Sequence, residues 1–494
     1  MTATSYDVDE VAIVGGGDVG LLTALLVKEI NPGFRVTVVD DFDEDPPETG
    51  KSTINHLRTI LHGVLDIDED RFIEEAKPVW KASIHFEDWC GRDSFHLPFD
   101  DDLFPLTEKS DQQLEEMYYR YRNHEYRTPN TEFVEQGKTP FKSKDGDRYP
   151  HISYHLSLKR FNDLLEDLCE EREIELIDDR IEEVRVEDEE IATIASDATE
   201  YDADLYVDAT GFKRLLMRNL DNEYNHFDLP IDAAVVAQTD LPLSEVVPAT
   251  VIESGEAGWF WQIDTYDCRD LGYVYSSSHM SAEEAKAEMM ETRKEDISEA
   301  DIQEYEFESG YYEKAWVGNC VAVGNALGFI EPLQSTALTQ SALFAKKFAE
   351  LVEKGYQLNN QGVRSLYNTF TSRAWRDVYE YISIHYKHAP GGTEFWEDVQ
   401  SVNSEKTVPQ YTHYQQNGFH LHQELDKGLE VPLGPFRFPH WAYFRVLRGF
   451  GVESEFYQNL DLDVRPEIAS AIDESYEEIQ KSVEEYLSYD EFYG

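Results

Sequence analysis

The chain has 494 residues, which is enough for two to three domains or for one large α/β body. Its 100 Asp and Glu against 43 Lys and Arg give a formal net charge of -57, which excludes nucleic acid and anionic membranes as partners, because phosphate binding needs clustered cations. Hydrophobic residues make up 41% and the acids are spread along the chain, so we expect a folded protein from a halophilic source rather than a disordered one.

The cysteines and the N-terminus indicate a soluble, cytoplasmic protein. Only four cysteines occur, with no CxxC pair and no metal-ligand spacing, so neither a disulfide framework nor a metal site is expected. The first residues, MTATSYDVDE, lack the basic and apolar segments of a signal peptide, and no run of about 18 apolar residues follows them.

The N-terminal pattern predicts a dinucleotide-binding βαβ unit. An apolar strand at 11–14 leads into a GxGxxG turn, an apolar helix to about residue 30 and a second strand at 35–39. The turn glycines Gly15, Gly17 and Gly20 let a pyrophosphate approach the helix N-terminus, and Asp40 stands where an acid binds the ribose hydroxyls. The alternative is a purely structural glycine turn.

The next segments alternate between polar and apolar patterns. Residues 108–148 are polar and rich in tyrosine, which is typical of an inserted loop or lid. A helix is expected at 158–172, and strands are expected at 174–186 (two strands), 191–194, 204–208, 233–237, 259–263, 272–276 and 320–323. A helix begins near residue 336 and the last third is mostly helical. It ends in an amphipathic helix after Pro466, for which packing within the chain is the default and a homodimer contact the alternative.

Two later strand-to-turn segments favour FAD over NAD as the dinucleotide. The strand at 204–208 ends at Asp208 and turns through Gly211, and the strand at 320–323 is followed by Gly324. Such returns let a flavoprotein close on the cofactor from its other end, so Asp208, Gly211 and Gly324 are predicted to contact FAD.

The chain resembles the flavin-dependent tryptophan halogenase family. The resemblance lies in motifs that occur in matching order over roughly the first four hundred residues: GKSTI at 50–54, WKASIHFEDW at 80–89, DATGF at 208–212, WFWQI at 259–263, WVGNCVA at 316–322, GFIEPLQST at 328–336, HYK at 385–387 and FW at 395–396. It implies an α/β, Rossmann-like FAD-binding fold of the flavoprotein monooxygenase type. The FAD module would span residues 1–345, with substrate-binding segments near 80–155 and 220–315, and a helical part, 346–494, would cover the substrate site.

The resemblance also implies the reaction. In that family, reduced FAD from a separate flavin reductase and oxygen oxidise chloride or bromide to hypohalous acid, which passes through a tunnel to a lysine. Lys81 stands at that lysine's place, where its amine can hydrogen-bond the hypohalous acid or carry the halogen on nitrogen. The substrate would be a small aromatic or electron-rich molecule. Without the motif, Lys81 is a surface charge on a strand edge.

Other positions take roles from the same resemblance. Leu333 belongs to the turn that binds flavin, and Ser335 and Thr336 flank the halide at a helix N-terminus, although both could instead cap that helix. Trp259 and Trp261 match the residues that separate substrate from flavin, with core packing as the equal alternative. His96 and Phe99 are expected to line the substrate pocket.

Gln334 is the main departure from the family pattern, because the tryptophan-type enzymes carry a glutamate there. An amide cannot act as a base, but it can orient hypohalous acid, so an electron-rich ring such as a phenol becomes the natural substrate. Lys51 also replaces a usual glutamate. The rival functions are an FAD-dependent monooxygenase without halogenation and a non-catalytic FAD-binding protein.

The stretch from Tyr118 to Arg127 is cationic and aromatic within an acidic chain. It predicts a clamp for an anionic or aromatic substrate through charge and stacking. The alternative is a set of arginines paired with surface carboxylates.

Overall fold

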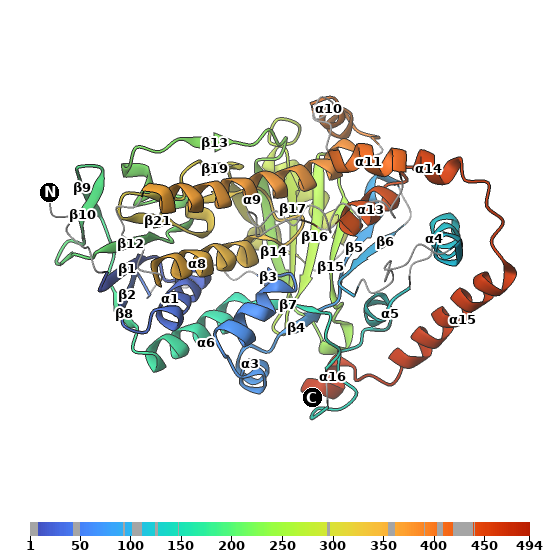
Figure 1. Cartoon of the computed structure of the whole chain (residues 1–494), viewed down its shortest axis with the longest axis horizontal. Helices are drawn as coiled ribbons and strands as arrows, with labels where there is room; N and C mark the ends of the chain where they lie inside the picture. The colour runs from blue at the N-terminus through green and yellow to red at the C-terminus, as the bar shows by residue number, and fades with distance from the viewer. Residues whose placement is uncertain are drawn as a thin grey trace.

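A mostly parallel six-stranded sheet and a mostly antiparallel seven-stranded sheet organise the chain (Figure 1). The computed structural model describes residues 8–42, 50–91, 94–100, 111–123, 127–146, 148–293, 297–353, 361–389, 391–402, 409–417, 438 and 440–494. The six-stranded sheet occupies the left half of Figure 1, the seven-stranded sheet stands in the middle, and α13, α4, α5 and α15 gather on the right.

The six-stranded sheet forms around the N-terminal strand. Its order is β20 (Trp316–Val317), β21 (Cys320–Ala322), β12 (Leu205–Asp208), β1 (Glu10–Val14), β2 (Arg35–Asp40) and β8 (Glu175–Asp178). β1 pairs in parallel with both β12 and β2. Its residues Val11 to Val14 are all buried, as the continuous apolar run of a strand covered on both faces requires. Helix α1 (Asp18–Ile30) packs against α6 (Leu158–Glu171) and α8 (Ala337–Glu353). This arrangement is the predicted Rossmann-like βαβ unit.

The seven-stranded sheet carries the second part of the core. Its order is β18 (Gln303–Glu306), β14 (Ala233–Thr239), β17 (Arg269–Tyr275), β16 (Gly258–Asp264), β15 (Ala249–Ser254), β5 (Ser83–Glu87) and β6 (Phe95–Pro98). All neighbours are antiparallel except β15 and β5, which run parallel. The parallel pairing joins the segment after Lys81 to this sheet, so the predicted catalytic lysine lies at the junction of two sheets.

Three small sheets complete the strands. The first, β3 (Gly50–Ser52), β7 (Ser153–Ser157) and β4 (Val79–Lys81), ends at Lys81. The second contains β13 (Tyr224–His226), β19 (Gly310–Tyr312) and β22 (Gly328–Phe329), and the third contains β11 (Glu200–Tyr201), β10 (Glu190–Ala195) and β9 (Glu183–Glu187). The predicted strands between residues 174 and 323 are therefore confirmed.

The last third is helical, as the sequence predicts. After α8, it contains α9 (Gln361–Lys387), α10 (Glu394–Val402), α11 (Pro409–Asn417), α13 (His440–Gly449), α14 (Glu455–Gln458), α15 (Pro466–Val483) and α16 (Tyr489–Tyr493). The first two thirds of the chain contain, besides α1 and α6, the helices α2 (His56–Arg58), α3 (Glu69–Ala76), α4 (Asp111–Asn123), α5 (Pro129–Gln136) and α7 (Ala282–Arg293). The apolar face of α15 buries Ile468, Ile472 and Tyr476 inside the chain, where the helix packs on α4 and α5. A homodimer stays a prediction, and so does the division at residue 345.

One expectation needs correction. Within residues 108–148 the structure has two helices, α4 and α5, and not a loop, although residues 108–110, 124–126 and 147 lie outside the described part. Thr128 caps α5 by accepting from the backbone N–H of Thr131, and Phe133 is buried in the main core. The polar, tyrosine-rich composition hid these helices because their few apolar residues pack against α15 and the sheet rather than in a long periodic stripe.

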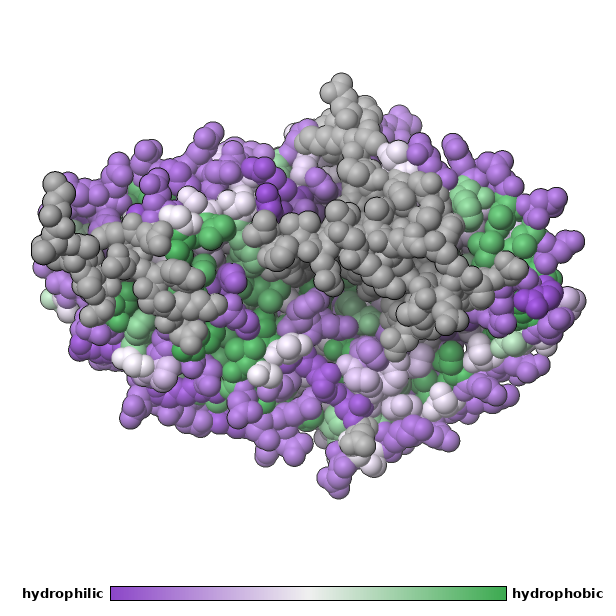
Figure 2. Space-filling model, in the orientation of Figure 1, coloured by the Kyte–Doolittle hydropathy of each residue, from purple (hydrophilic) through white to green (hydrophobic). Residues whose placement is uncertain are grey.

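The visible surface is hydrophilic along most of its outline, as the excess of acids predicts, and hydrophobic side chains gather in the left half, around α1 and α8 (Figure 2). No helix among the described residues is long and apolar enough to cross a membrane. Within the same residues, no group of His, Cys, Asp and Glu could hold a metal ion.

Candidate active site

The glycine turn after β1 is built for close backbone approach. A Cβ on Gly15, whose φ is +108°, would lie 2.4 Å from the Ala209 carbonyl oxygen, and one on Gly20 would lie 1.9 Å from the Gly15 oxygen. A Cβ on Gly17 would meet nothing within 4 Å. Gly17 is also the N-cap of α1 and provides no side-chain cap, and of the first helical amides that of Val19 donates to the Asp18 side chain at 2.9 Å. These features fit the pyrophosphate of a dinucleotide.

Two acids flank this turn in different ways. At the end of β2, Asp40 accepts a hydrogen bond from the Gly16 backbone N–H at 2.5 Å, beside the turn, where the sequence predicts the ribose. At the end of β12, Asp208 is fully buried and accepts from the backbone amides of Leu216 and Met217, each at 2.8 Å. Burial raises the pKa of Asp208. Its carboxylate thus holds its own turn and would act on a cofactor through that turn.

The two downstream glycines adopt the left-handed conformation that favours glycine. Gly211 has φ +60° and its Cβ position is open, whereas a Cβ on Gly324, at φ +59°, would lie 3.0 Å from Val19 of α1. The two turns follow the parallel strands β12 and β21, so they lie at the carboxyl edge of the sheet, where such folds bind dinucleotides. Direct contact of these glycines with FAD stays a prediction.

Lys81 is fully buried at the end of β4. Among the described residues, its Nζ has one hydrogen-bond partner, the Ser335 hydroxyl at 3.0 Å, and it lies 5.3 Å from the centre of the Phe99 ring. Burial holds the pKa of the Lys81 ammonium well below its ordinary value. The interpretation of Lys81 as a surface charge is therefore wrong: the structure gives a dry amine that loses its proton easily.

The turn opposite Lys81 precedes α8. Ser335 has φ +55°, which is strained for a residue with a side chain, and its backbone N–H donates to the Pro332 carbonyl at 3.0 Å. Leu333 is fully buried, and the Thr336 carbonyl accepts the first helical hydrogen bond from Gln340. The strained turn aims the Ser335 hydroxyl at Lys81 and leaves the first backbone N–H groups of α8 to other acceptors. The structure thus brings together Lys81, Phe99 and the predicted halide residues.

Gln334 pairs with a buried histidine that the sequence analysis left without a role. The amide nitrogen of Gln334 lies 2.7 Å from Nε2 of His385, and Nδ1 of His385 lies 3.1 Å from the Tyr381 carbonyl oxygen. Burial lowers the pKa of His385 to about 3, so the ring is neutral. Because a carbonyl can only accept, Nδ1 carries the proton and Nε2 accepts from Gln334.

A second missed group lies behind the turn. Glu331 is buried and accepts from the indole N–H of Trp259 at 3.2 Å and from the Tyr386 hydroxyl at 2.5 Å. Burial raises the pKa of Glu331 to about 8. The signal in the sequence was an acid between Ile330 and Pro332 in an otherwise apolar segment. Trp259 thus anchors the turn as well as packing in the core.

The remaining predicted residues, Trp261 and His96, lie at two different places. The Trp261 ring lies 6.0 Å from Trp259 and covers Gly272 on β17, where a Cβ would come within 1.9 Å of the ring. His96 on β6 does not join Lys81 directly: its Nδ1 lies 3.1 Å from the hydroxyl of Ser83, two residues after Lys81, and its Nε2 lies 3.2 Å from Glu135. His96 belongs to a cavity next to the lysine site.

A Rossmann-like unit with a glycine turn at a helix N-terminus is typical of proteins that bind a dinucleotide cofactor. The family described as tryptophan halogenase matches residues 10–461, and the chain belongs to this family. It is an enzyme family whose members depend on flavin.

Individual relatives agree with this assignment. Tryptophan 6-halogenase SttH of Streptomyces toxytricini is 26% identical over 431 residues, which cover 80% of this chain and 81% of the relative. Tryptophan 7-halogenase RebH of Lentzea aerocolonigenes is 27% identical over 432 residues, 79% of each protein. The structure of BrvH, a flavin-dependent halogenase from Brevundimonas sp. BAL3, superposes with a TM-score of 0.81 at 24% identity and covers 98% of each chain. The Rossmann-like FAD-binding fold is confirmed.

Proposed function

We propose that this enzyme halogenates an electron-rich aromatic substrate and that Lys81 holds the halogenating species. The observation that carries the proposal is the dry Lys81 amine, whose hydrogen-bond partner is the hydroxyl of Ser335. A neutral amine can donate an N–H to hypohalous acid or take the halogen on nitrogen, whereas a charged ammonium has no lone pair for the second role.

The overall chemistry balances with the cofactors that the family implies. When bound, reduced FAD supplies two electrons with which oxygen oxidises chloride or bromide to hypohalous acid, and one water leaves. The substrate ring then exchanges a hydrogen for the halogen, and the ring proton and the hydroxide of the hypohalous acid leave as a second water. Reduced flavin would come from a separate reductase.

Two parts of the turn before α8 have separate tasks. The backbone N–H of Thr336, with the Ser335 hydroxyl beside it, would bind the halide at the start of the helix. His385 fixes the Gln334 amide by accepting its N–H, so the amide oxygen can accept the O–H of hypohalous acid. An amide cannot remove a ring proton, which favours phenols and other rings that activate themselves.

Product mass spectrometry with purified protein, FAD, a generic flavin reductase, NADH and bromide tests the proposal over a panel of phenols and indoles. We expect a bromine isotope doublet for wild type and for Lys142→Ala, which removes an exposed lysine paired with Glu485. The doublet should vanish in Lys81→Ala. Hydroxylated product would favour a monooxygenase, and FAD that binds without being oxidised would favour a non-catalytic protein.

The cofactor residues need a readout that does not depend on turnover. Gly17→Ala places a methyl group in the open space before α1, so we expect wild-type thermal stability with FAD affinity lowered about tenfold or more, measured by flavin fluorescence quenching. Gly20→Ala is the matched control for packing. Its Cβ would meet the Gly15 oxygen at 1.9 Å, so unfolding should become easier by about 1–3 kcal/mol. Unchanged FAD affinity in Gly17→Ala would contradict this placement.

A further inference from the structure

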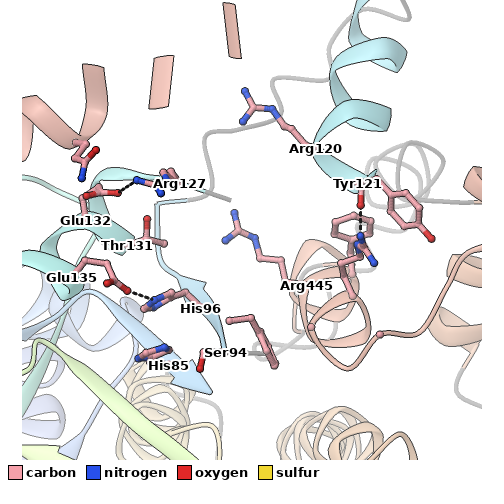
Figure 3. A pocket seen from close by; sticks show the side chains of 16 residues that line it. His85, Ser94, His96, Arg120, Tyr121, Arg127, Thr131, Glu132, Glu135 and Arg445 are labelled. Carbon is pink, nitrogen blue, oxygen red and sulfur yellow. Dashed lines mark hydrogen bonds and ion pairs between the residues drawn. The ribbon is translucent and has the colours of Figure 1, made fainter. Parts of the chain in front are cut away.

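A cavity of about 590 Å³ lies beside the β5–β6 hairpin and between α4, α5 and α13. Four arginines line it: Arg120 on α4, Arg127 just before α5, and Arg445 and Arg448 on α13. Figure 3 shows Arg120 and Arg445 coming from these different elements, and Arg127 turned toward Glu132. Segments more than three hundred residues apart thus contribute cations to one wall.

The side chains that line this cavity carry more positive than negative charge, whereas the chain as a whole is negative. Two acids, Glu132 and Glu135, line it with the four arginines, while the whole protein has a net charge of -57. Glu135 is hydrogen-bonded to His96, and Glu132 approaches Arg127 at 3.4 Å. In a chain with more than twice as many acids as bases, a pocket with excess cations indicates recognition of an anion.

Neutral partners hold two of these arginines in place. Arg120 donates to the Tyr476 hydroxyl at 2.6 Å, and Arg448 donates to the Tyr121 carbonyl and lies 4.3 Å from the centre of that ring. A hydroxyl or carbonyl orients a guanidinium without cancelling its charge. Planar guanidinium groups with several N–H donors then suit the oxygens of a carboxylate, sulfonate or phosphate.

Aromatic side chains form the rest of the wall and the link to the lysine site. Phe95, Tyr121 and Phe444 line the cavity, and His96 stacks on His85 with ring centres 4.0 Å apart. His96 also contacts Ser83, two residues after Lys81, and Phe99 at the end of the same hairpin faces the Lys81 amine. A ligand in the cavity therefore lies next to the β5–β6 hairpin, whose two ends meet the Lys81 site through Ser83 and Phe99.

We infer that this cavity recognises an aromatic acid, holding its oxyanion group on the arginines and its ring against the aromatic wall toward the Lys81 site. The inference rests on the proposed function, because it names the substrate class of that same site. A volume of about 590 Å³ accommodates a molecule larger than a single small ring. The cavity would thus offer an acid a positive charge that the chain as a whole, at a net charge of -57, does not.

Equilibrium dialysis tests the inference without turnover. The probes are phenyl, phenol, indole and naphthyl acetic acids, each paired with its neutral amide. Wild type should bind at least one acid about tenfold more tightly than its amide, and Arg127→Gln and Arg120→Gln should each weaken that acid by about tenfold. Arg180→Gln, which removes an exposed arginine far from the cavity in sequence, should leave binding unchanged.

The outcomes separate the two proposals. Equal binding of acid and amide across the panel, no binding of any acid, or an equal loss in Arg180→Gln would overturn the inference. Arg120 contacts Tyr476 of α15, so Arg120→Gln could loosen the packing of α4 on α15. The Arg127 side chain is 40% exposed, so Arg127→Gln tests the same binding without that loss of packing. If acids bind as expected but no substrate is brominated, only the proposed function fails; bromination of a neutral phenol without acid preference removes only this inference.

Discussion

Lys81 and the arginine-lined cavity both lie next to the β5–β6 hairpin, but their cationic side chains meet different surroundings. The Lys81 side chain is 0% exposed, and burial lowers its pKa, which favours the neutral form of the amine. The arginines keep their charge, because a guanidinium does not lose its proton in proteins, whether it is buried as in Arg445 or partly exposed as in Arg127. Desolvation thus favours a neutral amine at Lys81, whereas the high intrinsic pKa of a guanidinium preserves a charge for recognition.

The largest expected effect comes from forcing a permanent charge into the dry site. Lys81→Arg should lower the free energy of unfolding by about 3 kcal/mol or more, because a guanidinium cannot neutralise itself there. Arg127→Lys, in the open cavity, should change it by less than about 0.5 kcal/mol. Urea titrations of both variants, with Lys81→Met as the uncharged control, measure the contrast. A Lys81→Arg protein as stable as wild type would show that the lysine site is wet.

A smaller effect is expected at the acid buried behind the same turn. The pKa of Glu331 is raised to about 8, so the folded protein keeps a proton that the unfolded chain releases. Stability from this group is full below its ordinary pKa and falls as pH rises toward about 8, by at most about 1.4 kcal/mol per pH unit. Glu331→Gln has no proton to lose, so its stability relative to wild type should rise between about pH 5 and about pH 8. Parallel pH profiles of the two proteins would contradict a protonated Glu331.

The smallest effect is expected from a change at Gln334, whose amide donates to the neutral ring of His385. Gln334→Glu sets a carboxylate against Nε2 of His385, and the pair then needs a shared proton that the unfolded chain does not hold at neutral pH. The variant should lose about 1–2 kcal/mol relative to wild type as pH rises from about 6.5 to about 8, a range in which the His385 ring of wild type is neutral in the folded protein and mostly neutral in the unfolded chain. Thermal melts across this range measure the loss, and His385→Asn in the same background shows whether the histidine causes it. A pH-independent difference would mean that the amide and the imidazole are not coupled.

Features encoded over short stretches of sequence were predictable. The strand, the glycine turn and the acid at residue 40 form one continuous βαβ unit, and the apolar runs place the strands between residues 174 and 323. The motif around Lys81 and the GFIEPLQST turn identified the family before any contact was known. The salt-rich, cytoplasmic setting drawn from the charge remains a prediction.

By itself, then, the sequence determined the cofactor-binding unit, the family and the residue types at the site, because backbone turns and periodicity depend on neighbours a few residues away. Only the tertiary structure decided that Lys81 is dry, that Gln334 meets His385 fifty-one residues later, and that arginines 120 and 445 share a cavity. Burial, and hence the charge state of each group, depends on packing between distant segments, which no local pattern encodes.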